Sequence, residues 1–258
     1  MTALVWDSVG DRVFQTGVDR GVLYLPDGSG VPWNGLVGVT ETPSREVKPF
    51  YLDGVKYMEH HVLGEFNGEL RAFTYPDEFD EINGIAEDDG VFFHDQPPQS
   101  FGLSYRTLIG DDVEGIAHGY KIHVLYNLMA APTNNAYESL ANVVTPLVFA
   151  WNLSGVPVAY PGRRPTVHIS FDSTKMEPAL LAVYEEQLYG SLETEPSLPS
   201  MVELLSLDAI TIIDHEDGTW SAVGPDELIT MTDDTTFEIT EVDAEYSDTD
   251  TYEISSTE

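Results

Sequence analysis

Alternation of apolar and polar residues along most of the chain is the feature that most restricts its fold. Segments 101–109, 120–126 and 166–171 alternate mostly apolar side chains with more polar neighbours. A period of two places such side chains on one face of a β-strand. A further apolar run followed by a Gly-containing turn lies in 145–162. The sequence therefore predicts a mainly β protein with many short strands.

Two dipeptides in segment 50–75 predict tight turns. Asp53-Gly54 and Asn67-Gly68 each lie between apolar alternating runs. Asp-Gly and Asn-Gly are preferred in two-residue type I′ turns, where both residues need a positive φ. Residues 50–75 are therefore predicted to form a three-stranded meander.

One segment, 172–190, has the periodicity of a helix instead. The apolar residues at helical spacing are Leu180, Leu181, Tyr184 and Leu188. Asp172 or Ser173 is predicted to cap its start, and Gly190 is predicted to end it. This helix is expected to flank the β-structure.

Charge divides the chain unevenly. The 258 residues include 45 acids and 11 bases, and all the bases lie in residues 1–175. Residues 176–258 hold 22 acids and no base. Segment 191–200 is rich in Pro and Ser, as domain boundaries often are. We therefore predict a main β domain over 1–195 and an acidic C-terminal β extension over 196–258 with four or five short strands.

The acidic surface has three interpretations: a solvated, solubilising surface, a surface that does not hold polyanions, or an adaptation to high salt. A protein that grips DNA needs Lys and Arg to displace phosphate counterions, and this chain has few. The absence of cysteine excludes disulfides and thiolate metal sites. No run approaches the ~18 apolar residues of a membrane span, and the first residues do not resemble a signal peptide, so we expect a cytoplasmic protein with no membrane span.

Motifs for chemistry are not found. The glycines near residue 30 do not fit a dinucleotide fingerprint, and no phosphate-binding loop follows. The acidic segments 214–218 and 247–253 do not fit the register of an EF-hand loop. Glu59, His60 and His61 have the residue types of a metal site, but adjacent histidines on a strand point to opposite faces. We therefore predict no catalytic, cofactor-binding or metal-binding residues, and no cofactor.

Two motifs in order carry a resemblance to a known family. The signature positions are Tyr75, Pro76, Asp77, Glu78 and Phe79, followed by Phe101, Gly102, Leu103, Ser104, Tyr105, Arg106 and Thr107. Together with segments 143–158 and 164–190, they make the chain similar to the major tail protein, or tail tube protein, of long-tailed, siphovirus-type bacteriophages of actinobacteria. The resemblance covers residues 45–190, and segment 217–240 is similar to the usual ending of that group.

The resemblance implies a tail-tube-type β-sandwich with a flanking α-helix and a structural, non-enzymatic role. Six copies would form a ring, and rings would stack into a tube around a tape-measure protein, in contact with tail-tip and tail-terminator proteins. Genomic DNA would pass through an acidic channel without tight binding. The protein would be assembled in the host cytoplasm and reside in the virion tail.

Within that assembly, a loop over 110–119 is expected to carry contacts between subunits. Four bases, Arg106, Lys121, Arg163 and Arg164, are candidates for ion pairs between subunits.

Two other classes of function remain open. One is a monomeric carbohydrate-binding or adhesin-like β-sandwich that uses exposed Trp33, Trp220 and Tyr246 as stacking platforms. The other is a metal-dependent hydrolase built on the region of His60 and His61.

Overall fold

The computed structural model of the chain describes residues 4–43, 46–62, 65–133, 137, 139, 146–192, 194–207, 211–214, 220–223, 229–231, 236–240 and 249–253. For residues 43, 46, 61 and 62, and for all those from 211 onward, the description covers the backbone alone. The chain forms two compact units, Met1–Ser170 and Phe171–Glu258, and each is considered by itself.

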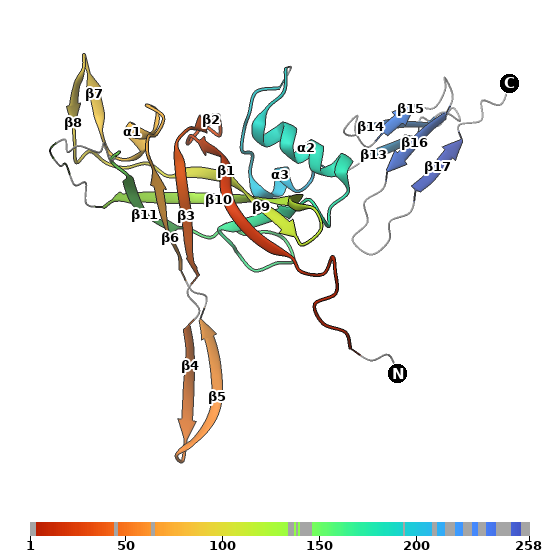
Figure 1. The fold of residues 1–258 in the computed structure, drawn as a ribbon, viewed down its shortest axis with the longest axis horizontal. Helices are drawn as coiled ribbons and strands as arrows, with labels where there is room; N and C mark the ends of the chain where they lie inside the picture. Colours follow the sequence, from red (N-terminus) through yellow and green to blue (C-terminus); the bar gives the residue numbers. More distant parts are fainter. Residues whose placement is uncertain are drawn as a thin grey trace. The chain divides into compact units, whose positions relative to one another are not determined.

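The first unit consists almost entirely of antiparallel strands (Figure 1). Among the described residues they are β1 (Phe14–Tyr24), β2 (Gly30–Trp33), β3 (Leu36–Pro43), β4 (Glu46–Leu52), β5 (Val55–Val62), β6 (Phe66–Ala72), β7 (Ala86–Asp88), β8 (Val91–Phe93), β9 (Phe101–Asp111), β10 (Gly115–Pro132) and β11 (Phe149–Gly155), with one short helix, α1 (Phe79–Ile82). The main sheet has the order β2-β1-β9-β10-β11-β6-β3, and β12 (His168–Asp172) pairs with β10. The prediction of a mainly β fold is confirmed.

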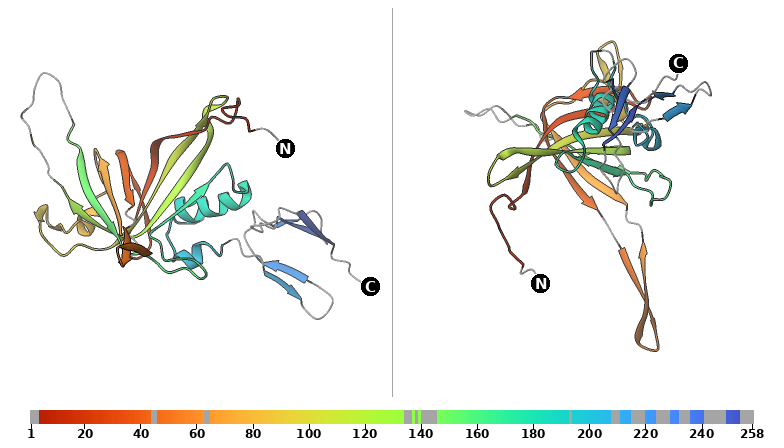
Figure 2. Two further views of the ribbon diagram at one scale, coloured as in Figure 1. Left: turned by 90° about the horizontal axis from the view of Figure 1, so that it is seen from below. Right: turned by 90° about the vertical axis from the view of Figure 1, so that its right-hand side faces the viewer.

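The main sheet is strongly curved (Figure 2). Gly21 of β1 lies so close to Leu36 of β3 that an added Cβ would be 3.0 Å from the Leu36 Cδ2 atom. Two strands that are far apart in the sheet order therefore meet across its concave face. The curvature encloses a hydrophobic core between the two halves of the sheet.

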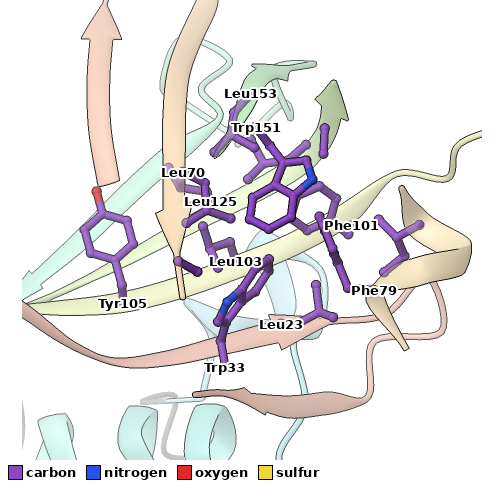
Figure 3. Packing of buried hydrophobic residues seen from close by; sticks show 14 of the residues in the cluster. Leu23, Trp33, Leu70, Phe79, Phe101, Leu103, Tyr105, Leu125, Trp151 and Leu153 are labelled. Carbon is purple, nitrogen blue, oxygen red and sulfur yellow. The ribbon is translucent and has the colours of Figure 1, made fainter. Parts of the chain in front are cut away.

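Aromatic rings fill this core (Figure 3). The Trp33 and Phe79 ring centroids lie 4.7 Å apart, and Trp151 packs edge-on against Phe79 at 5.2 Å. Phe101 adds a further edge-on contact with Phe79 at 5.6 Å. Phe79 comes from α1, so this short helix closes the core by inserting one ring among the strands.

β9 is buried on both faces along its first half, which explains its apolar sequence. Phe101, Leu103 and Tyr105 point into the aromatic core. On the opposite face, the Ser104 hydroxyl lies 3.1 Å from the Tyr24 hydroxyl, and both residues are buried. This hydrogen bond satisfies two polar groups that would otherwise be costly to bury.

The turn prediction at Asp53-Gly54 is confirmed, and the one at Asn67-Gly68 is wrong. Asp53 and Gly54 have φ values of 50° and 77°, as a type I′ turn between β4 and β5 requires. Asn67 and Gly68 instead lie inside β6, which pairs with β3 and β11 and not with β5. The predicted three-stranded meander is therefore a hairpin followed by a strand of the main sheet.

Gly68 is needed because another backbone lies close to it. An added Cβ would be 2.8 Å from the carbonyl oxygen of Thr40 in β3. A glycine inside a strand often marks such an approach, and in sequence it cannot be told from the glycine of a turn.

The predicted loop over 110–119 is also wrong, because β9 and β10 continue through it as a hairpin. The Asp111 carboxylate accepts hydrogen bonds from the backbone N–H groups of Val113 and Glu114, which stabilises the tight turn. The connection is thus a short, internally bonded turn.

Sequence periodicity did not identify β1. Its register with β9 shifts twice, between Thr16 and Asp19 and between Asp19 and Val22. Arg20 has a φ of 46°, and the first seven residues are at least partly exposed. Bulges of this kind break the alternation on which strand prediction depends.

The second unit begins with the predicted helix, α2 (Pro178–Tyr189). Its apolar side chains at 180, 181, 184 and 188 are buried, and Gly190 ends it with a φ of 78°. The predicted cap is wrong, because Glu177 is the N-cap and Pro178 opens the helix. The Asp172 carboxylate instead binds the backbone N–H and hydroxyl of Thr174.

The described residues of the acidic end form one more helix and five short strands. The helix α3 (Met201–Leu204) starts with a capping box between Ser200 and Glu203. The strands are β13 (Thr211–Asp214), β14 (Trp220–Val223), β15 (Ile229–Met231), β16 (Thr236–Thr240) and β17 (Thr249–Glu253), in sheets β13-β14 and β15-β16-β17. Their number agrees with the four or five short strands predicted for the acidic C-terminal extension. The boundary at 195 stays a prediction.

Replacement of Gly68 by alanine tests the close approach of β6 and β3. We expect Gly68→Ala to lower the free energy of unfolding by about 1–3 kcal/mol, because the added methyl group must displace backbone. Asn67→Ala is the control, since this neighbouring side chain is exposed and its loss should change stability by less than about 0.5 kcal/mol. Equal effects in urea unfolding would contradict this account of Gly68.

Candidate functional site

The β4–β5 hairpin is exposed at every residue whose side chain the structure describes. β4 and β5 pair only with each other (Figure 1). Each strand therefore has an outer edge whose backbone groups have no strand partner in the part of the chain that the structure describes. Unpaired edges of this kind are templates for pairing with another chain.

Large apolar side chains cover this hairpin although it has no core of its own. The exposed ones are Val47, Phe50, Tyr51, Leu52, Val55, Tyr57 and Met58, with Tyr57 reaching 73% exposure. An isolated two-stranded hairpin is marginally stable in water. Contiguous exposed apolar groups on a regular element are typical of a surface that another chain covers.

Two other segments of the first unit share this character. They are the segment before and into β1, with Leu4, Val5, Trp6, Val9, Val13 and Phe14, and the strand β8, with Val91, Phe92 and Phe93. Together with the hairpin they form three separate exposed apolar segments. Because the three segments are separate, they could contact more than one neighbouring chain.

The signature positions of the family resemblance lie in and around the aromatic core. Tyr75 packs edge-on against Phe149 and Trp151, and Phe79 is fully buried. Pro76, Asp77 and Glu78 form the turn that leads into α1, where the Phe79 N–H donates to the Pro76 carbonyl oxygen at 3.0 Å.

The second signature motif is part of the same framework. Phe101, Leu103 and Tyr105 are core residues, Gly102 is buried opposite Tyr24 of β1, and Ser104 binds Tyr24. The sequence motifs thus identify residues that hold the curved sheet together.

Arg106 forms an ion pair within its own chain. Its guanidinium donates two hydrogen bonds to the Asp19 carboxylate, at 2.8 and 2.7 Å, and lies over the Tyr120 ring. These hydrogen bonds lower the pKa of Asp19. Arg163 and Arg164 are exposed, and Lys121 is half-buried on β10. Pairing of these four bases with a neighbouring subunit stays a prediction.

A polar cluster that periodicity did not reveal lies where β3, β9, β10 and β12 approach one another. The Tyr105 hydroxyl donates to the Glu41 carboxylate. His168 lies between Glu41 and His123, with its Nδ1 3.3 Å from Glu41 Oε2 and its Nε2 3.0 Å from His123 Nδ1. The other His123 nitrogen lies 3.1 Å from Thr107 Oγ1. We call Glu41, Tyr105, Thr107, His123 and His168 the polar cluster.

Three pKa values are displaced in the polar cluster. Burial alone would raise the pKa of Glu41, but hydrogen bonds from His168 and Tyr105 and the charge of the histidines outweigh it and lower the pKa to about 2. Burial, together with the charge of His168, lowers the pKa of His123 to about 4. Burial and the hydrogen bond to Glu41 raise the pKa of Tyr105. The cluster therefore favours an ionised carboxylate beside an uncharged His123.

One of the three residues predicted to be exposed stacking platforms is buried. Trp33 is buried, and its indole N–H donates to the Thr74 carbonyl oxygen at 3.1 Å, so its assignment as an exposed platform is wrong. The side chains of Trp220 and Tyr246, and residues 215–218 of the acidic segment 214–218, lie outside the described residues.

The proposed metal residues of β5 have cationic neighbours. Glu59 forms an ion pair with Lys56, and Lys48 of β4 lies opposite His60. Two ammonium groups at this position disfavour a divalent cation there. The side chain of His61 is outside the described part of the chain.

Comparison with known proteins gives matches in structure alone. No protein-family model matches the sequence, and no curated protein sequence matches it. One similar solved chain is from the sheath–tube complex of an extracellular contractile injection system, PVC, in the extended state, with 17% identity, 59% of this chain and 88% of that chain covered, and a TM-score of 0.32. Another is from the tube-terminating cap of the anti-feeding prophage, with 11% identity, coverages of 67% and 97%, and a TM-score of 0.34.

A third similar chain is from the baseplate of the same prophage, with 10% identity, coverages of 65% and 97%, and a TM-score of 0.31. These similarities are distant in sequence and in geometry. Among the described helices, none is long and apolar enough to cross a membrane.

The displaced pKa values predict acid sensitivity in two adjacent ranges. As the pH falls from about 6.5 to about 4, the unfolded chain takes up a proton at His123 that the folded chain does not, so stability is lost. As it falls from about 4.5 to about 2, the same holds for Glu41.

We therefore expect Glu41→Gln, measured by urea unfolding with a chelator present, to flatten the pH dependence below about 4.5. Glu87→Gln, at an exposed acid in β7, is the control for the change in net charge. Parallel pH profiles for wild type and Glu41→Gln would contradict the assigned role of Glu41.

Proposed function

We propose that the chain is a structural, non-enzymatic subunit of a phage tail tube of the siphovirus type. Six copies form a ring, and rings stack into a tube through which genomic DNA passes during ejection. The proposal combines the family resemblance of the signature motifs with the mainly β fold. It applies to a virion tail component that is assembled in the host cytoplasm.

The single observation that carries the proposal is the β4–β5 hairpin. It combines unpaired strand edges with seven exposed large apolar side chains. A monomer would gain nothing from such an element and would risk aggregation. In a closed ring, edges and apolar faces of neighbouring copies cover one another, which removes both liabilities.

The charge of the chain suits a conduit for DNA. A net charge of −34 leaves few cations with which to bind phosphates tightly. An acidic wall repels DNA softly, and at a screening length of about 8 Å the repulsion acts only near the wall. We infer that DNA slides through the channel without specific or tight binding.

The partners follow from the same assignment. A tape-measure protein would occupy the channel before DNA does, and tail-tip and tail-terminator proteins would contact the ends of the tube. The exposed segments around β1 and β8 are available for contacts between stacked rings or with these end proteins.

A monomeric carbohydrate-binding β-sandwich is the second candidate, and a metal-dependent hydrolase is the third. The carbohydrate-binding candidate has only two of its three proposed platform residues left, since Trp33 is buried. The hydrolase candidate is disfavoured by the lysines beside Glu59 and His60.

Electron microscopy of concentrated protein tests the assembly. We expect hollow tubes of stacked six-fold rings from the wild-type chain. Tyr51→Ser and Tyr57→Ser should raise the concentration needed for assembly by about tenfold each, as expected for loss of about 1.4 kcal/mol of contact energy. Both side chains are exposed, so the subunit fold should be unchanged.

Leu192→Ser is the matched control, because this apolar side chain is fully exposed and lies outside the three apolar segments. It should assemble like the wild type. Solid particles without a channel, or hairpin variants that assemble as the wild type does, would contradict the proposal.

Deletion of residues 199–258 tests the acidic C-terminal extension. We expect the shortened chain to form thinner tubes, because the curved sheet and α2 lie before residue 199. The lack of any base in the extension suits an outer surface that keeps particles apart. Rings that form but do not stack would instead place the extension between rings.

A further inference from the structure

The polar cluster places three metal-ligand side chains next to one another. Each nitrogen of His168 has a close polar neighbour: Glu41 Oε2 lies 3.3 Å from Nδ1, and His123 Nδ1 lies 3.0 Å from Nε2. The other nitrogen of His123 lies 3.1 Å from Thr107 Oγ1, a hydroxyl that can donate or accept a hydrogen bond. Two imidazoles and one carboxylate therefore meet between β3, β10 and β12.

We propose that Glu41, His123 and His168 bind a divalent transition-metal cation of the zinc class. Two imidazole nitrogens and one carboxylate form a donor set that zinc uses in proteins, with the fourth position open to water. The cation would join β3 to β10 and β12. This inference does not depend on the proposed tube function.

The separations of the donor atoms suit this cation. One ligand atom from each of the three residues can be chosen so that all lie within 4.8 Å of one another. His123 Nδ1 lies 3.0 Å from His168 Nε2 and 3.9 Å from Glu41 Oε1. Ligands at about 2.0–2.1 Å from a tetrahedral zinc are separated by roughly 3.3 Å, so the side chains must move together where their donor atoms now lie farther apart than this.

Neighbouring residues hold the donors in place. Thr107 Oγ1 can accept from His123 Nε2, which directs the Nδ1 lone pair toward the other two ligands. The Tyr105 ring stacks on His123 with centroids 4.8 Å apart and an interplanar angle of 7°, and its hydroxyl binds Glu41. Partners of this kind fix the tautomer and orientation of metal ligands.

Access and rigidity also favour binding. The three ligand side chains are 13–26% exposed, so an ion can reach them while most of their surface stays covered. All three come from strands of the main sheet. Sites built on such rigid elements need little reorganisation to bind a ligand.

A second group on the chain serves as an internal control. Asp111, Glu114 and His118 also place donor atoms within 4.8 Å of one another. Here, however, Asp111 Oδ1 accepts backbone hydrogen bonds that form the β9–β10 turn, and Glu114 is largely exposed. We expect this group to contribute no comparable affinity.

Calorimetric titration of the chelator-treated full chain with Zn²⁺ at pH 7 tests the site. We expect one saturable site on the wild type and its loss in His168→Ala. Thr107→Val, which keeps the shape of the side chain but removes the acceptor, should bind about 10-fold more weakly or worse. His118→Ala should bind as the wild type does.

Thermal unfolding provides a second measurement on the same proteins. Zn²⁺ should raise the midpoint of the wild type, because a ligand that binds the folded state stabilises it, and should raise that of Thr107→Val less at equal concentration. If His168→Ala does not fold, Thr107→Val still decides the question. Absence of saturable binding, or binding lost in His118→Ala instead, would overturn the proposal.

Discussion

The packing of Trp33, Phe79 and Trp151 is the interaction on which the rest of the first unit depends. These rings come from β2, α1 and β11, which are distant in the sequence, and they meet at 4.7–5.9 Å. Large aromatic side chains contribute much apolar area for few residues, which suits a chain whose surface is dominated by acids. Their burial favours the curvature that brings β3 toward β1 and β9.

The same curvature creates the polar cluster. Glu41 lies on β3, and its partners Tyr105, His123 and His168 lie on β9, β10 and β12. In a flat sheet of the observed strand order, β3 and β9 would be separated by three strands. The apolar core therefore positions the polar groups, and these in turn connect β3 to the opposite half of the sheet.

Exposure and burial are divided sharply along the chain. The signature residues 75–79 and 101–107 serve the core and its immediate border, whereas the apolar residues of β4 and β5 are exposed. The motifs that resemble a family thus specify the subunit fold. The surfaces that would build an assembly lie in the β4–β5 hairpin, between β3 and β6. None of the signature positions lies in this hairpin.

The sequence by itself determined the mainly β character, the Asp53-Gly54 turn, the helix that ends at Gly190 and most strands of the acidic end, because each depends on local periodicity or local backbone preference. It did not determine β1, where bulges break the alternation, or the role of Gly68, where a turn signal and a close strand approach use the same residue. Only the tertiary structure decided that His123 and His168 meet Glu41 and that Trp33 is buried. Such contacts join residues that are distant along the chain, and they exist only once the sheet has curved around its aromatic core.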